Sequence, residues 1–188
     1  MSLVVMEQRK KIHPHKFTLW VGIGSMVMMF AGLTSAYIVK RDQPNWTSFE
    51  LPGLFWFSTA VIILSSATMF LAVRAFKDKE RRKYRRLITV TFFLGVLFLV
   101  LQFMGFYQLW MTGSTLQKTV SYSFLYVIVG LHALHLLGGI IALLVLFLRA
   151  YNRKIKTYDP VPIEILATFW HFVDFLWIYL LIFLLLIR

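Results

Sequence analysis

The sequence predicts an all-α integral membrane protein, a single transmembrane domain of five helices with a cytoplasmic N-terminus and an external C-terminus. Three observations lead to this fold class. Of the 188 residues, 59% are hydrophobic and 17% are aromatic, whereas soluble domains contain about 45–50% apolar residues. The apolar residues gather into five long runs, and lysine and arginine are divided unevenly between the connections.

The five apolar runs cover about residues 17–39, 54–76, 87–111, 122–148 and 163–187. Each reaches the roughly 20 residues that an α-helix needs to cross about 30 Å of hydrocarbon. A helix pairs all of its backbone groups within itself, and the sequence lacks the short alternating segments of a membrane barrel. The first run is too long for the apolar core of a cleaved signal peptide. We therefore expect five membrane-spanning helices.

Basic residues predict the orientation of the helices. Sixteen of the 20 lysines and arginines fall on the side of the N-terminus, and the other side holds only Lys40, Arg41, Lys118 and Arg188. Cytoplasmic loops of membrane proteins carry this kind of excess. The net charge of +12 then reflects topology. We expect no nucleic-acid partner, because no basic stripe alternates with aromatic residues in a soluble segment.

Two basic features are candidates for contact with lipid headgroups. The cluster at residues 77–86 is first a determinant of topology, with anionic headgroups as secondary partners. Arg149 stands at the inner end of the fourth run and is similarly placed for a lipid phosphate. Cysteine is absent from the sequence, which excludes disulfides, thiolate metal sites and thiol catalysis.

Small residues suggest where helices pack closely. In the first run Gly32 and Ala36 recur at a spacing of four, which favours close contact between helices. In the fourth run three glycines allow a neighbouring backbone or a lipid chain to approach, at Gly130, Gly138 and Gly139. In the fifth run Trp170 and Trp177 share one face, and we expect both to pack against other helices.

The ionisable residues of the apolar runs are concentrated in the fourth and fifth. His132 and His135 are three residues apart, as are His171 and Asp174, and Glu164 precedes His171 by seven. These spacings return to one helix face. At 1.5 Å per residue His135 lies about 20 Å from the outer end and His171 about 12 Å from the inner end. Because a short connection favours antiparallel neighbours, we expect one intramembrane polar cluster.

Three interpretations of this cluster are open. The first is a hydrogen-bonded lock between the fourth and fifth helices, with each bond worth about 0.6–2 kcal/mol. The second is a metal or haem site, for example a haem-b electron carrier that uses His132 or His135 with His171. The third is a proton path. Transporters usually show internal repeats and broken helices, and neither occurs here.

The number of ligands favours the lock. A di-iron site in a helical bundle needs several carboxylates in Glu-x-x-His form, whereas these runs contain only Glu164 and Asp174. The His-Glu-x-x-His motif of zinc proteases is also missing. We therefore expect no catalytic and no metal-binding residue in this chain.

The fifth run resembles a known family. The string Trp170-His171-Phe172-Val173-Asp174, with Trp177 and Glu164 at matching distances, is similar to the C-terminal signature of subunit III of the haem–copper oxidases. Gly130-x-His132-x-x-His135 with Gly138-Gly139, and Leu101-Gln102 in the third run, also match. The resemblance is to a short five-helix form. Met26 stands where the family often has a glutamate, so no role of that acid is carried over.

The resemblance implies a subunit without a redox centre. The expectation is a non-catalytic part of cytochrome c oxidase in the bacterial cytoplasmic membrane, where haem and copper belong to subunits I and II. The subunit would pack on subunit I, bind phospholipid, and support proton uptake and stable turnover in aerobic electron transport. Whether cytochrome c or quinol donates the electrons would depend on other subunits.

Overall fold

The computed structural model describes residues 14–41, 53–111, 120–152 and 160–187. These residues form five α-helices: α1 (Pro14–Lys40), α2 (Leu54–Lys77), α3 (Arg81–Met111), α4 (Val120–Tyr151) and α5 (Val161–Ile187). All five are long and apolar enough to cross a membrane. The predicted fold class is confirmed, and each helix overlaps one of the five apolar runs. The orientation in the membrane remains a prediction.

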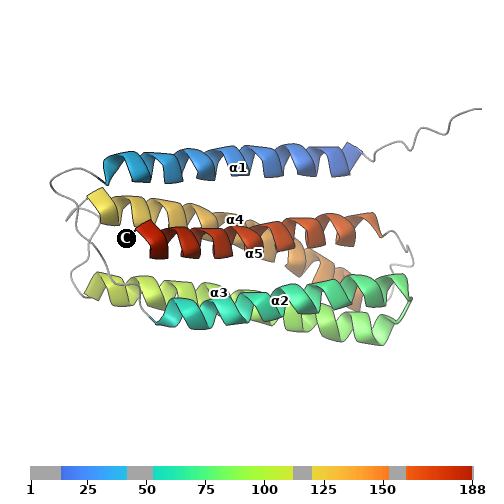
Figure 1. Cartoon of the computed structure of the whole chain (residues 1–188). Helices are drawn as coiled ribbons and strands as arrows, with labels where there is room; N and C mark the ends of the chain where they lie inside the picture. Colours follow the sequence, from blue (N-terminus) through green and yellow to red (C-terminus); the bar gives the residue numbers. More distant parts are fainter. Residues whose placement is uncertain (1–13, 42–52, 112–119, 153–159, 188) are drawn as a thin grey trace, which may run out of the picture.

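The helices alternate in direction along the chain. Figure 1 shows the N-terminal ends of α1, α3 and α5 at the same end of the molecule as the C-terminal ends of α2 and α4. This is the alternation that five consecutive membrane crossings require. The basic residues around the α2–α3 turn and Lys16 in the first turn of α1 therefore lie at one common end.

Helix α3 is longer than its apolar run. It begins at Arg81, whereas hydropathy predicts a start near residue 87. The three-residue turn before it places Lys79 in the left-handed region, with φ 59°, and the Tyr84 amide then donates to the Glu80 carbonyl. Hydropathy cannot detect this extra turn, because the basic residues of the first turns are polar yet still pair their backbone groups within the helix.

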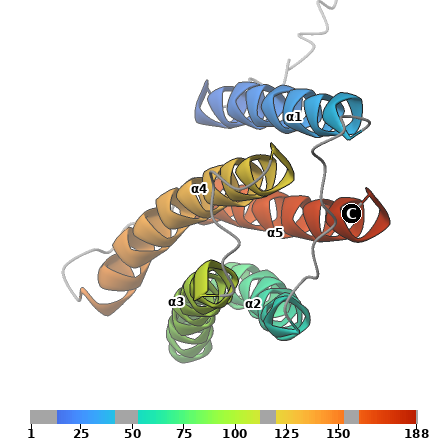
Figure 2. The same cartoon turned by 90° about the vertical axis from the view of Figure 1, so that its left-hand side faces the viewer.

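Helix α5 lies at the centre of the five-helix bundle. Figure 2 shows α5 beside α4, with α1 on one side and α2 and α3 on the other. In the described ranges α1 contacts α4 and α5 and reaches neither α2 nor α3, while α2 packs on α3 and α5. The antiparallel pairing of α4 and α5 that the short connection predicts is confirmed.

The small residues of α1 do not mediate helix packing within this chain. Gly32 and Ala36 are exposed, and a Cβ added to Gly32 would meet no atom within 4 Å. The prediction of close contact at these two positions is therefore wrong for the described residues. Spacing shows that small residues share a face, but it does not show which way that face points.

Candidate functional site

Three polar side chains of α5 bond to hydroxyl groups of α2. We call this set the α2–α5 seam. Its pairs are Trp170 Nε1 donating to Ser65 Oγ at 3.1 Å, Trp177 Nε1 donating to Thr59 Oγ1 at 3.0 Å, and His171 Nδ1 sharing a bond of 2.6 Å with Ser66 Oγ. Two of these residues, Trp170 and His171, belong to the Trp-His-Phe-Val-Asp string, so much of that string serves to attach α5 to α2.

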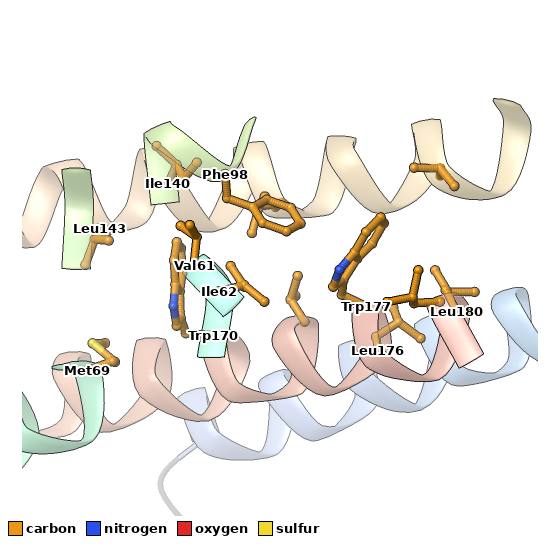
Figure 3. Close-up of a cluster of buried hydrophobic side chains, with 14 of the residues drawn as sticks. Val61, Ile62, Met69, Phe98, Ile140, Leu143, Trp170, Leu176, Trp177 and Leu180 are labelled. Carbon is orange, nitrogen blue, oxygen red and sulfur yellow. The ribbon is translucent and has the colours of Figure 1, made fainter. Parts of the chain in front are cut away.

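Trp170 fills the space where four helices meet. Its side chain is fully buried, and Figure 3 shows the indole pointing from α5 toward Val61 and Ile140. The ring lies against two glycines. A Cβ added to Gly95 would stand 2.7 Å from Cη2 of the indole, and one added to Gly139 would stand 3.4 Å from Cε3. Because glycine has no Cβ, the indole ring can lie flat between α3 and α4 at these two positions.

Trp177 and His132 form an aromatic group in the core. The Trp177 ring centroid is 5.2 Å from that of His132 and 5.3 Å from that of Phe98, and Figure 3 shows Trp177 close to Phe98. His132 is 1% exposed, and neither ring nitrogen has a hydrogen-bond partner among the described residues. The imidazole of His132 is thus packed as a ring between α3 and α5.

His135 turns away from the seam. Its Nδ1 lies 2.7 Å from the carbonyl oxygen of Leu131, one turn earlier in α4. Its ring meets Phe30 of α1 edge-on, with centroids 6.0 Å apart. Although His132 and His135 are three residues apart, they contact different neighbouring helices.

Asp174 is a buried acid beside the seam. Its side chain is 4% exposed. Neither of its carboxyl oxygens has a hydrogen-bond partner among the described residues. Asp174 is therefore enclosed beside the seam without taking part in its hydrogen bonds.

Glu164 of α5 forms ion pairs with one lysine of α1 and one of α2. One carboxylate oxygen is 2.8 Å from Lys16 Nζ of α1 and the other is 2.9 Å from Lys77 Nζ of α2. In the described ranges no Cα atom of α1 lies within 8 Å of one of α2, so this carboxylate bridges two helices whose backbones are apart.

The single polar cluster expected from spacing and depth is therefore divided into separate parts. Glu164 pairs with lysines, and His171 bonds to Ser66 of α2. Asp174 has no hydrogen-bond partner among the described residues, and His132 and His135 make no hydrogen bond to α5 there. The expected lock between α4 and α5 is corrected: the hydrogen bonds join α2 to α5. The rotation of each helix about its own axis decides which neighbouring helix a side chain meets. The spacing of residues along the sequence does not determine that rotation.

The hydroxyl groups of α2 are the residues that sequence reasoning missed. Besides the seam, Ser58 accepts a hydrogen bond from Gln102 of α3 at 3.1 Å, and the Thr68 and Thr91 hydroxyls are 2.9 Å apart. The sequence pattern that could have predicted these contacts is the series of serine and threonine residues at positions 58, 59, 65, 66 and 68. In a membrane such side chains bond across helices.

Other predicted positions have different surroundings. Gly139 is in contact with Phe169 and Trp170, but Gly130 and Gly138 are exposed, with no atom within 4 Å of an added Cβ. The helix packing predicted for these two is not made within the described chain. Arg149 lies in the last turn of α4, and its contact with lipid remains a prediction.

No group of three histidine, aspartate or glutamate side chains in the described ranges is placed to hold a metal ion. The haem alternative requires His171 to face His132 or His135. The structure instead directs His171 to α2 and packs His132 against Phe98 and Trp177.

Comparison with known proteins adds the family. Residues 15–187 match the family model of cytochrome c oxidase subunit III. A probable cytochrome c oxidase subunit 3 of Nocardia farcinica is 32% identical, over 84% of this chain and 80% of the relative. Cytochrome c oxidase subunit 3 of Corynebacterium diphtheriae is 30% identical, over 86% and 85%. Subunit 3 of the cytochrome bo(3) ubiquinol oxidase of Pseudomonas aeruginosa is 28% identical, over 86% and 79%.

Proposed function

The chain belongs to the cytochrome c oxidase subunit III family, and from this premise we propose that it is a non-catalytic subunit of a proton-pumping haem–copper oxidase. The match over nearly the whole length of the chain carries the proposal. The chemistry of oxygen reduction then belongs to the partner subunits, which hold haem and copper.

The contacts of α5 support a structural role. The indole N–H groups of Trp170 and Trp177 and Nδ1 of His171 are bonded to α2. His132 and Asp174, whose polar atoms have no hydrogen-bond partner among the described residues, are enclosed in the core. These bonds fix α5 between α2 and α4. Support of catalysis elsewhere requires a rigid scaffold of this kind.

The proposed partners are subunit I, in direct contact, then subunit II and the other respiratory subunits. Many large apolar side chains point outward from the helices. In a membrane subunit such faces are covered either by lipid or by helices of partners. The proposal includes bound phospholipid, with Arg149 as a headgroup contact, and a role in sustained proton uptake and turnover.

The proposed location is the bacterial cytoplasmic membrane, with the N-terminus inside. The excess of basic residues at the end of the molecule that holds the α2–α3 turn supports this orientation. The electron donor is a property of other subunits, because relatives named for cytochrome c and for ubiquinol both match this chain.

One purification tests the proposal. An affinity tag on the chain is used to isolate its complex from detergent-solubilised membranes, and the associated proteins are identified. We expect a haem–copper subunit I to co-purify, with a haem spectrum that stays with subunit I when the chain is split off. Isolation without any haem–copper subunit would overturn the proposal.

A further inference from the structure

The two halves of α1 are attached to the rest of the bundle in different ways. Its C-terminal half is anchored by Phe30, Thr34 and Tyr37, whose side chains are 1%, 4% and 0% exposed. Tyr37 packs edge-on against one phenylalanine ring of α4 and one of α5, and the Thr34 hydroxyl lies 3.2 Å from that of Tyr179 in α5. Both α4 and α5 therefore hold this half of α1.

The first eight residues of α1, which we call the arm (residues 14–21), have no such anchor. None of these eight residues is buried, and Phe17 and Trp20 are each 63% exposed. Figure 2 shows that α4, which contacts the other half of α1, turns away from α1 toward its own C-terminal end. A segment with so few buried contacts has little local stability.

The arm joins the anchored half through the sequence Gly22-Ile23-Gly24-Ser25. A Cβ added to either glycine would meet no atom within 4 Å, so helix packing does not require glycine there. Glycine weakens a helix because its backbone adopts other conformations easily. The Ser25 hydroxyl donates to the Gly22 carbonyl at 2.7 Å, and side-chain bonds of this kind often bend helices. Glycine and serine together are typical of the places where helices kink.

One ion pair attaches the arm to α5. Lys16 Nζ lies 2.8 Å from a carboxylate oxygen of Glu164, and this is the single hydrogen bond or ion pair between the arm and another helix in the part of the chain that the structure describes. The Lys16 side chain is 41% exposed, and exposed pairs are weak and screened by salt. Because Lys77 of α2 binds the other oxygen at 2.9 Å, Glu164 keeps a partner when Lys16 leaves.

We propose that the arm is a movable gate, hinged at residues 22–25 and latched closed by the ion pair of Lys16 with Glu164. In the latched position the arm forms one side of a cavity of about 440 Å³ that reaches Thr168 and His171 of α5. Release of the latch swings the arm outward and opens this stretch of α5 to water from the end of the molecule that holds the α2–α3 turn. The gate goes beyond the proposed scaffold role, because it makes access to α5 depend on one weak ion pair.

A single introduced thiol measures this access. The chain contains no cysteine, so Thr168→Cys supplies the only thiol of this chain and serves as the parent variant. The purified oxidase complex is treated with a charged maleimide, and the mass of the chain gives the rate of modification. We expect Glu164→Gln and Lys16→Gln each to raise the parent rate about two- to fivefold, the upper range for one exposed ion pair. Lys16→Arg retains the pair and the parent rate.

Three controls separate the latch from a general loosening of the helices. Lys77→Gln removes a charge beside the same carboxylate but leaves the bond from Lys16, and we expect the parent rate. A thiol at Arg82→Cys, which is exposed beside the α2–α3 turn, reports the reactivity of the maleimide and is insensitive to Glu164→Gln. High salt screens the ion pair without any change at the latch, and we expect it to raise the Thr168→Cys rate relative to the Arg82→Cys rate.

The hinge is tested in the unlatched Glu164→Gln variant. Gly22→Ala with Gly24→Ala stiffens the helix without a steric clash, and we expect this change to return the rate of modification toward the parent rate. Gly32→Ala is the matched control. Its added Cβ also meets no atom within 4 Å, but position 32 lies in the anchored half, so we expect no effect on the rate.

Two sets of results would overturn the gate. The first is a parent rate in Glu164→Gln, in Lys16→Gln and at high salt, or an equal rise in Lys77→Gln and Lys16→Gln. The second is an equal effect of the double alanine variant and Gly32→Ala. Subunit I is quantified in the same samples, so that each rate refers to assembled complex. Absence of subunit I from the wild type would refute the proposed function, while the rates on the chain would still decide the gate.

Discussion

Trp170 of α5 lies directly against the backbone of Gly95 in α3, so closely that a Cβ at position 95 would stand 2.7 Å from the indole Cη2. The indole cannot move aside easily, because it is fully buried and its Nε1 donates to Ser65 of α2. One residue of α5 thereby fixes the separation of α2, α3 and α4.

Gly95→Ala is expected to destabilise the protein. Overpacking of this kind costs about 1–3 kcal/mol, and the better helix propensity of alanine offsets at most about 1 kcal/mol of it. Gly24→Ala is the matched control, since a Cβ there meets no atom within 4 Å. The free energies of unfolding in detergent micelles are compared. An equal effect of the two changes would contradict the close packing described above.

The bond between His171 and Ser66 is expected to hold α5 to α2. A double-mutant cycle with Ser66→Ala and His171→Phe measures the coupling, and the 2.6 Å contact predicts a coupling energy of about 0.6–2 kcal/mol. The parallel cycle between His132 and Ser66 serves as a control, because no hydrogen bond joins these two in the described chain. Additive effects of Ser66→Ala and His171→Phe would show that the bond contributes nothing.

Asp174→Asn is expected to leave the oxidase assembled. Asparagine keeps the shape of the side chain and removes only the capacity for charge, and no cation faces the buried carboxyl group among the described residues. Volume-conserving changes usually cost less than about 1.5 kcal/mol. The yield of complex and the amount of subunit I bound to the chain are measured. Complete loss of assembly would indicate that the negative charge itself is required.

The haem alternative makes an optical prediction. A haem-b carrier that uses His171 with His132 or His135 has a Soret band in the isolated chain, and His171→Ala abolishes it. We expect the isolated chain to be colourless, because His171 is bonded to Ser66 and His132 is packed against Trp177. A Soret band that disappears in His171→Ala would replace the proposed function with the carrier.

The sequence by itself determined the five helices and one of their neighbour relationships, the pairing of α4 with α5. Hydropathy and length are local properties, and a spanning segment must form its own backbone hydrogen bonds. Each apolar run therefore corresponds to one of the helices α1 to α5, and the predicted and observed bounds differ only at the helix ends. The short connection between α4 and α5 was enough to predict that they are neighbours. The family was also visible in the string that begins at Trp170.

Only the tertiary structure decided which face of each helix meets which neighbour. In a membrane, lipid tails are as apolar as a protein core, so the composition of a helix does not reveal its buried side. Gly32 and Gly138 lie on outer helix faces, where an added Cβ would meet no atom within 4 Å, whereas Gly95 and Gly139 lie on inner faces against Trp170. Spacing and depth predicted that the polar residues of α4 and α5 would lie together. The rotation of the helices separates them instead, and His171 bonds to α2 rather than to α4.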